Sequence, residues 1–162
     1  MIFMDKVSTI KQLNAEVAEL LGMERKTFRF IPDWNAIKTY GQCGFNENGW
    51  YIKISKYLTK DAEIINTMLH ELCHLYDENR SGHGYSWKCI AAKVGAHYNT
   101  CISVTDEKEV SEAALDKAVA KVICNGCGIE TYLYRRTKAY KTECRNYHCT
   151  NCGGSFTFIK LK

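Results

Sequence analysis

The first regular pattern along the chain is a helical one. Apolar residues recur at intervals of three and four between Asp5 and Met23, and polar residues fill the positions between them. This spacing places the apolar side chains on one face of a helix, and Gly22 is typical of a helix end. The sequence therefore predicts an amphipathic helix that packs through Val7, Ile10, Leu13, Val17, Leu20 and Leu21.

Three stretches that follow are typical of β-strands. Residues 26–31 (KTFRFI) alternate in polarity and are bounded by Pro32, the one proline of the chain. Residues 39–45 and 49–55 are also strand-like, and they flank the segment NENG. Because Asn48-Gly49 is a strong signal for a hairpin turn, we expect the last two strands to pair with each other.

Helical periodicity returns on either side of a glycine. The first segment, residues 58–82, has Thr59 as a possible cap and Asp61 in its first turn, and we expect Gly82 to break it. The second, residues 85–98, keeps the helical pattern until about Gly95. The first of these helices has a stripe of apolar residues for burial at Ile65, Met68, Leu69, Leu72 and Tyr76.

The chain changes character after about residue 99. Residues 99–118 are polar and acidic, which favours a linker with a helical stretch, whereas residues 119–162 hold two cysteine pairs beside alternating, strand-like residues. We therefore expect an α+β chain of two domains. Residues 1–118, which include the linker, form helices packed on a small antiparallel sheet, and residues 119–162 form a small β module.

Length and composition fit this organisation. A chain of 162 residues suffices for one domain with a small appended module. Hydrophobic residues make up 46% and charged residues 25%, as in ordinary globular proteins. No apolar run approaches the roughly 20 residues that span a bilayer. Asp5 and the short apolar stretches near it do not fit a secretory signal, so we expect an intracellular protein with no membrane partner.

Cysteine use points to metal. In a reducing compartment, paired cysteines hold metal more often than they form disulfides. The chain has nine cysteines, of which five crowd the last 40 residues. The other four are scattered, and the simplest interpretation of these is as small buried hydrophobic residues. The scattered cysteines are Cys43, Cys73, Cys89 and Cys101.

The segment HELCH, residues 70–74, fits the metal-binding pattern H-E-x-x-H. Positions i and i+4 lie about 40° apart around a helix, so the imidazoles of His70 and His74 can reach one metal. Glu71 follows the first histidine, where its carboxylate can reach a metal-bound water without binding the metal. A zinc ion lowers the pKa of such a water to about 7, and the glutamate can act as general base and then as general acid.

A catalytic zinc needs a third protein ligand and an open position. His83 is the best candidate, because Gly82 and Gly84 let the backbone turn back sharply beside it. Asp77 and Glu78 are rivals from the same predicted helix, and His97 is a further alternative. Tyr85 and Trp87 border the predicted site, and core packing is the simpler role for Trp87.

The tail carries a second candidate metal site. Two C-x-x-C pairs, Cys124–Cys127 and Cys149–Cys152, have the spacing of a structural zinc ribbon. Gly128 and Gly153-Gly154 suit the tight turns around the sulfurs, and the metal would replace the core that so short a module lacks. His148 or Cys144 could substitute for Cys149 as the fourth ligand, and a disulfide-bonded tail is the alternative.

The basic charge of the chain is concentrated in this tail. Residues 121–162 carry eight Lys or Arg and two acidic residues, a net +6, whereas the rest of the chain carries a net −2. Six tyrosines and phenylalanines lie among these charges, so the segment can contact phosphates and stack on unpaired bases, or it can be a solvated basic loop. The candidate nucleic-acid contacts are Arg135, Arg136, Lys138, Lys141 and Arg145.

Together these segments resemble the SprT-like metalloproteases, whose eukaryotic members include Spartan. The matching segments are HELCH, GHGYSWKCIAAKVG at 82–95, CNGCG and CTNCGGSFTFIK, in the same order after a helix and a strand hairpin. The resemblance covers nearly the whole chain. The segment between His74 and His83 is shorter than in Spartan, and the long extension that follows the cysteines of Spartan is missing here.

The resemblance implies a zincin-like metalloprotease domain followed by a zinc ribbon. It further implies a zinc endopeptidase that binds one catalytic and one structural Zn²⁺ and cleaves proteins bound or crosslinked to DNA, with DNA as activator. On this basis we expect non-sequence-specific DNA binding with single-stranded character, a role in DNA repair and a monomer, cytoplasmic in a prokaryote or virus and nuclear in a eukaryote. The alternative is a non-catalytic, zinc-containing DNA-binding or regulatory protein.

Overall fold

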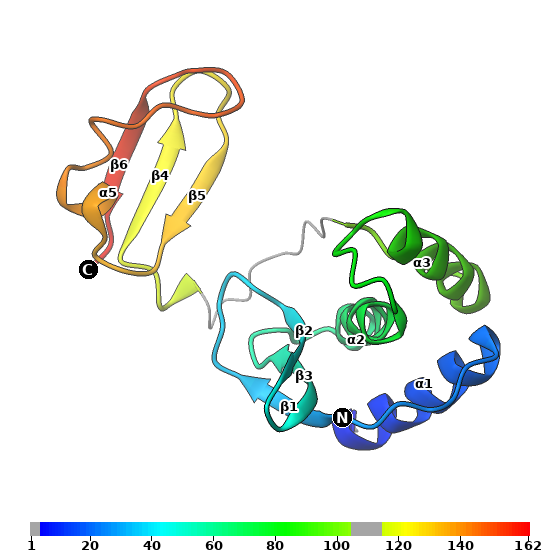
Figure 1. The fold of residues 1–162 in the computed structure, drawn as a ribbon. Coiled ribbons are helices and arrows are strands. Elements are labelled where there is room, and N and C mark those ends of the chain that lie inside the picture. Colours follow the sequence, from blue (N-terminus) through cyan, green and yellow to red (C-terminus); the bar gives the residue numbers. More distant parts are fainter. Residues whose placement is uncertain (1–3, 105–114) are drawn as a thin grey trace. The chain divides into compact units, whose positions relative to one another are not determined.

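A computed structural model of the protein describes residues 4–104 and 115–162 (Figure 1). The chain divides into two compact units, residues 1–109 and residues 110–162. The predicted boundary between residues 118 and 119 stays a prediction. The acidic part of the predicted linker, residues 105–114, lies outside the described residues.

The first helix forms as its sequence pattern predicts. Helix α1 spans Lys6–Leu21, and the side chain of Asp5 caps it by accepting a hydrogen bond from the backbone N–H of Val7 at 3.0 Å. Gly22 ends the helix in the left-handed conformation, with φ at 68°. The predicted apolar face is buried at its centre, although Val7 in the first turn is 40% exposed.

The sheet of the first unit is mixed. Strands β1 (Arg29–Trp34), β2 (Gly41–Asn46) and β3 (Gly49–Ser55) lie in the order β1-β3-β2. Strands β2 and β3 form the predicted antiparallel hairpin, but β1 runs parallel to β3. Strand β1 also begins later than predicted and continues through Pro32, which an edge strand tolerates because one side of its ladder is unpaired.

The hairpin turn lies one residue earlier than predicted. Asn46 pairs with Gly49, so Glu47 and Asn48 are the two turn residues. The side chain of Asn46 accepts a hydrogen bond from the backbone N–H of Asn48 at 2.9 Å, which stabilises the turn. Gly49 begins β3 with φ at 94°, a conformation that a side chain would strain.

Two helices follow the sheet, and their ends differ from the prediction. Helix α2 spans Asp61–Tyr76, so Lys60 is its N-cap and not Thr59, and it ends well before Gly82. Helix α3 spans Tyr85–Tyr98 and continues past Gly95 to a cap at Asn99. Gly95 is needed for close packing, because a Cβ there would lie 2.6 Å from the backbone oxygen of Thr100.

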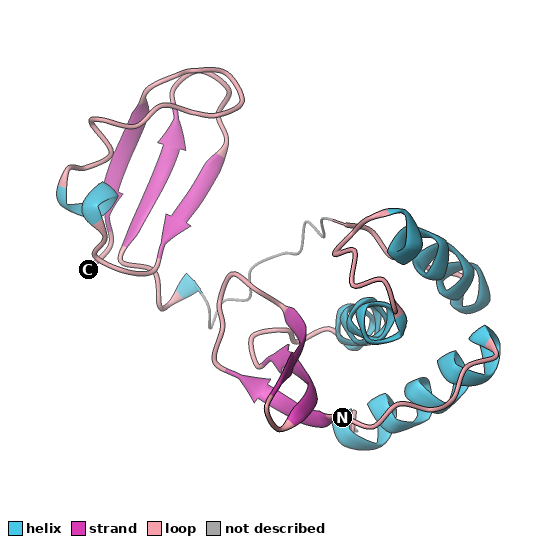
Figure 2. Cartoon of the chain, viewed as in Figure 1, coloured by secondary structure: helices cyan, strands magenta, loops and turns pink. Residues whose placement is uncertain are grey.

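Helix α2 is the centre of the first unit. It contacts β2 and β3 on one side and α1 and α3 on the other (Figures 1 and 2). Predicted core residues of this helix, Met68, Leu69, Leu72 and Tyr76, are buried, and so are Ile52 and Ile54 of β3. A helix enclosed in this way holds its side chains in fixed positions, which matters for the two histidines that it carries.

The second unit is a small antiparallel sheet with long turns (Figure 2). Strands β4 (Ala120–Cys124), β5 (Glu130–Leu133) and β6 (Phe156–Lys160) lie in the order β5-β4-β6, and a short helix, α5 (Lys138–Lys141), precedes the second cysteine pair. Its apolar core is small, with Ala118, Ala120 and Val122 buried. The α+β fold class with a small terminal β module is therefore confirmed.

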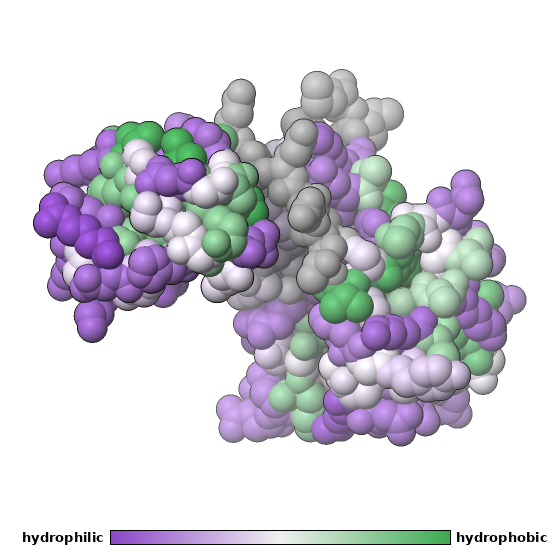
Figure 3. Space-filling view, turned by 90° about the horizontal axis from the view of Figure 1, so that it is seen from above, coloured by the Kyte–Doolittle hydropathy of each residue, from purple (hydrophilic) through white to green (hydrophobic). Residues whose placement is uncertain are grey.

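The described helices were compared with the length and apolar character of a membrane-spanning segment. In residues 4–104 and 115–162, none of the helices combines the length and the apolar character that crossing a bilayer requires. On the face shown in Figure 3, hydrophilic residues surround smaller apolar patches on both units.

Candidate metal centres

Helix α2 carries the first two histidines of the candidate catalytic site. His70 and His74 lie one turn apart, and both side chains are half-buried. Their Nε2 atoms are 3.2 Å apart, so both rings point to the same place beside the helix. The i, i+4 spacing thus has the geometric result that the sequence predicts.

His83 reaches the same place from the loop between α2 and α3. Its Nε2 atom lies 3.1 Å from that of His74 and 3.1 Å from that of His70. Gly82 before it has φ at 64°, and Gly84 after it is the N-cap of α3, so the glycines allow the sharp turn that was predicted.

The rival third ligands do not join the three imidazoles: Asp77 lines the cleft but is engaged by the following loop, and Glu78 and His97 are outside the histidine group. Asp77 is buried, and its Oδ2 atom accepts hydrogen bonds from the backbone N–H and the hydroxyl of Ser81, each at 2.8 Å. Burial alone would raise the pKa of this carboxyl, but hydrogen bonds from Ser86 and Ser81 outweigh it and lower the pKa. Asp77 therefore holds the loop that carries His83, while Glu78 and His97 are exposed. Neither belongs to the histidine group.

The donor set fits zinc. Tetrahedral ligands at the usual Zn–N distance lie about 3.3 Å apart, close to the observed spacing of the three Nε2 atoms. His70 Nδ1 lies 3.1 Å from the backbone oxygen of Ser103, which holds the proton on Nδ1 and leaves the lone pair on Nε2. Burial, followed by the charges of His70 and His83, lowers the pKa of His74 to about 4, so this imidazole is neutral at pH 7.

Trp87 packs against all three histidines. The ring centroid of this buried tryptophan lies 4.9 Å from that of His70, 5.2 Å from that of His74 and 4.6 Å from that of His83. Because one rigid indole touches each imidazole, it restricts the rotation of all three rings. Core packing was the simpler expectation for Trp87. The structure shows that the side chains it packs against include the three histidines.

Replacing Trp87 with alanine is expected to weaken zinc binding at the histidines by about 10–100-fold, the usual cost of losing an outer contact to metal ligands. Chelator competition on the full chain measures this, and zinc bound to the cysteines serves as an internal reference. Trp87→Phe should retain most of the affinity, and Trp34→Ala, on β1, is the control. An unchanged affinity in Trp87→Ala would show that the indole does not position the rings.

Glu71 lies with the histidines in one cleft. The cleft has a volume of about 550 Å³, and its walls come from β2, the start of β3, α2 and the loop to α3. Glu71 is only 5% exposed, and it packs so tightly under β2 that a Cβ on Gly41 would lie 2.4 Å from its Oε1 atom. The carboxyl group is therefore confined beside the histidines. Tyr85 is 85% exposed and does not line this cleft.

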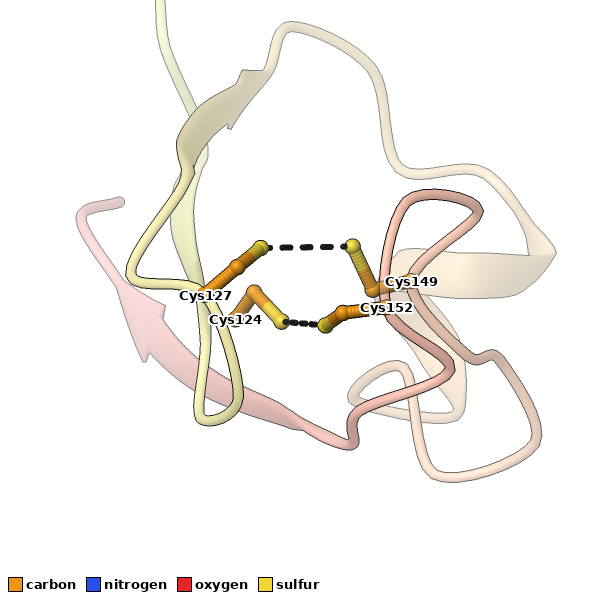
Figure 4. A group of neighbouring side chains, drawn as sticks. All are labelled: Cys124, Cys127, Cys149 and Cys152. Carbon is orange, nitrogen blue, oxygen red and sulfur yellow. Dashed lines mark hydrogen bonds between the residues drawn. The ribbon is translucent and has the colours of Figure 1, made fainter.

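Four cysteines converge in the second unit. Figure 4 shows their side chains pointing toward one another, one from the end of β4, one from the turn after it and two from the turn before β6. The sulfur atoms of Cys124 and Cys152 are 3.4 Å apart, and those of Cys127 and Cys149 are 3.7 Å apart. Thiolates around a tetrahedral zinc are about 3.8 Å apart, so the cluster fits a zinc ribbon.

The local backbone supports thiolates at this site. Hydrogen bonds from backbone N–H groups lower the pKa of the Cys124 thiol to about 6. The N–H of Cys127 has the largest effect, and that of Gly126 has a smaller one. Gly128 and Gly153 both have φ at 72°, as the predicted tight turns require. Cys144 is buried outside the group and His148 is exposed, so the structure places Cys149 and neither substitute with the other three.

The predicted nucleic-acid contacts are all exposed in the second unit. They lie on the segment between β5 and the second cysteine pair, around α5. Arg136 stacks at 6.0 Å over the ring of Tyr140, whereas Arg145 is paired with Glu143 at 2.6 Å. Arg135, Lys138 and Lys141 complete this basic segment, and Tyr147 is 40% exposed beside it.

Some residues of the histidine site were not predicted from the sequence. Ser103 contributes its backbone oxygen, and any residue type could supply that atom, so no sequence pattern marks it. Gly41 matters because a side chain at this position would collide with Glu71. Arg80, Phe45 and Trp50 also line the cleft. The two aromatic residues on either side of the predicted hairpin turn, Phe45 and Trp50, were the one available signal.

The sequence model of the SprT-like family matches residues 8–106, which is more than half of the chain and includes all three histidines. The match ends before the cysteine-rich unit begins. No curated protein matches the chain.

Proposed function

The chain belongs to the SprT-like family, and from this premise we propose that it is a zinc-dependent endopeptidase. Family membership indicates a zinc metalloprotease-like domain. The observation that carries the proposal further is the convergence of three Nε2 atoms within 3.2 Å of one another, in the same cleft as the buried carboxyl group of Glu71.

Each residue has a distinct role in this proposal. His70, His74 and His83 hold the catalytic zinc, which when bound lowers the pKa of water to about 7 and polarises a carbonyl group. Glu71 accepts the proton of the attacking water and then donates it to the leaving amine. A purely structural zinc site has no need of a carboxyl group confined beside it, so Glu71 favours hydrolysis over the non-catalytic alternative.

We also propose that the substrates are proteins bound or crosslinked to DNA, and that DNA activates cleavage. The support is the resemblance to Spartan together with the exposed basic and aromatic residues of the second unit. These residues neutralise phosphates and stack on unpaired bases without reading a sequence. The second zinc ion, at Cys124, Cys127, Cys149 and Cys152, keeps this unit folded.

DNA affinity is expected to fall steeply with salt and with the charge of the basic segment. Neutralising both Arg135 and Arg136 with glutamine should lower the slope of log K against log[salt] by about 1.4 for a single-stranded oligonucleotide, because two phosphate contacts are lost. Fluorescence anisotropy over a salt series measures the slope. The matched control is Lys88→Gln with Lys93→Gln, on exposed positions of α3. A slope equal to that of the wild type would remove the segment from the interface.

The proposed activity is tested with a protein crosslinked to a single-stranded oligonucleotide. We expect the full chain to cleave the crosslinked protein, to cleave the same protein more slowly without DNA, and to stop when a chelator removes zinc. Added zinc should restore cleavage. A zinc-loaded chain that cleaves neither the crosslinked protein nor any peptide would contradict the proposed peptidase, whereas cleavage independent of DNA would contradict only its activation.

A further inference from the structure

Arg80 places a cation in the wall of the candidate catalytic cleft. It lies in the loop between α2 and α3, three residues before His83, and it lines the same cleft as His70 and Glu71. Its backbone has φ at 48°, and its N–H donates a hydrogen bond to the backbone oxygen of Asp77 at 3.0 Å. The loop that Asp77 organises therefore fixes the position of Arg80 as well as that of His83.

Two aromatic residues of the β2–β3 hairpin support the Arg80 side chain. Its guanidinium carbon lies 5.4 Å from the ring centroid of Phe45 and 5.3 Å from that of Trp50, and the two rings meet edge to face at 5.3 Å. Contact with aromatic rings holds a guanidinium group in place. Its N–H groups lie in the plane of the guanidinium, so they stay able to donate hydrogen bonds. Phe45 is 56% exposed, so the support is at the open side of the cleft.

Among the described residues, none accepts a hydrogen bond from the Arg80 guanidinium. In the part of the chain that the structure describes, it makes neither a salt bridge nor a hydrogen bond, although a guanidinium group has five N–H donors. Asp77 is the acidic cleft residue that precedes Arg80 most closely in the sequence. Its buried carboxylate accepts hydrogen bonds from Ser81 instead. A cation that is held on two rings in this way is preorganised for an acceptor that comes from outside.

We propose that Arg80, with Phe45 and Trp50, forms a subsite that selects peptide substrates with an acidic side chain close to the cleaved bond. This inference rests on the proposed peptidase function. Three residues span at most about 11 Å, so Arg80 lies within that distance of His83 along the backbone. An extended peptide covers the same distance in about three residues. The selected Asp or Glu therefore lies within three residues of the cleaved bond and forms a two-pronged hydrogen bond with the guanidinium.

A peptide carboxylate suits this position better than a DNA phosphate does. A peptide must enter the cleft to reach Glu71, so its side chains pass Arg80 whenever cleavage occurs. The rings also hold the planar guanidinium in place, so less freedom is lost when it forms a charge-assisted hydrogen bond to a carboxylate.

Peptide binding to the full, zinc-loaded chain with Glu71→Gln tests the subsite without cleavage. Labelled peptides that carry Glu, Gln or Lys at each of the three positions on either side of one peptide bond are compared by fluorescence anisotropy. We expect the best Glu peptide to bind about tenfold more tightly than its Gln counterpart, the scale of one charge-assisted hydrogen bond. Adding Arg80→Gln should remove the difference, and adding Arg80→Glu should shift the preference to Lys. Arg29→Gln, an exposed arginine of β1, is the matched control.

The outcomes separate the subsite from the proposed function. A Glu preference that is absent, or that survives Arg80→Gln in a folded, zinc-loaded chain, overturns the subsite. So does a loss of oligonucleotide affinity in Arg80→Gln with unchanged peptide selectivity, which would make Arg80 a phosphate contact. Wild-type chain that cleaves Glu and Gln peptides equally well overturns the subsite but not the peptidase. Wild-type chain that cleaves neither these peptides nor the crosslinked protein overturns the peptidase, and the binding comparison still decides whether Arg80 selects acidic peptides.

Discussion

Replacing Glu71 with glutamine is expected to lower peptide hydrolysis by about 10²–10⁴-fold, the usual contribution of a general base and acid. Glutamine has nearly the same volume as glutamate, so it fits the tight space under Gly41, but it cannot accept the proton of the attacking water. Zinc content and thermal stability should therefore stay close to those of the wild type. Cleavage of a DNA-crosslinked protein, followed by gel densitometry, measures the effect.

The position of Glu71 makes this variant informative. Its carboxyl group is buried beside the histidines, whereas Glu78, a few residues later, is exposed. Glu78→Gln is therefore the matched control, and it should cleave at the wild-type rate. If Glu71→Gln also cleaves at the wild-type rate, another group accepts the proton and the assignment of Glu71 is wrong.

Replacing Cys149 with serine is expected to unfold the second unit. Structural zinc in small cysteine sites contributes about 10–16 kcal/mol of apparent binding free energy, and that energy is also folding energy. The apolar core of this unit is too small to replace it, since the buried positions of its central strand β4 are short side chains such as Ala120 and Val122. Zinc content should fall from two ions per chain to one, and the tail should become sensitive to protease.

Two further cysteine variants complete that experiment. Cys144→Ser should retain two zinc ions, because the Cys144 side chain is buried outside the four-sulfur group. Cys89→Ser, an exposed position on α3, controls for the loss of a thiol. If Cys149→Ser keeps two zinc ions while Cys144→Ser loses one, the ligand set of the ribbon is different from the one seen here.

The grouping of side chains at the two candidate metal centres was predictable because their spacing is local. His70 and His74 belong to one helix, so the helix geometry alone sets the distance between their rings. Each cysteine pair likewise belongs to one tight turn. The glycines beside His83 and after the cysteine pairs also had a local signal, because left-handed backbone conformations favour glycine.

Features that depend on tertiary packing were not predictable in the same way. The strand β1 has the same alternation whether it runs parallel or antiparallel to β3, so polarity could not give its direction. From the sequence, Trp87 is predicted to be an ordinary core residue of α3. Only the folded chain brings it against the histidines of α2 and of the loop that follows α2. Helix α2 stops at Tyr76 because Asp77 binds the loop that follows, a contact that helical periodicity does not reveal.

A crystal structure of the zinc-loaded full chain, with anomalous diffraction measured at the zinc edge, tests the central claim most directly. We expect two zinc peaks, one surrounded by the Nε2 atoms of His70, His74 and His83 and one by the four cysteine sulfurs. Density for the second peak alone, with the three imidazole rings turned away from one another, would contradict a catalytic zinc site.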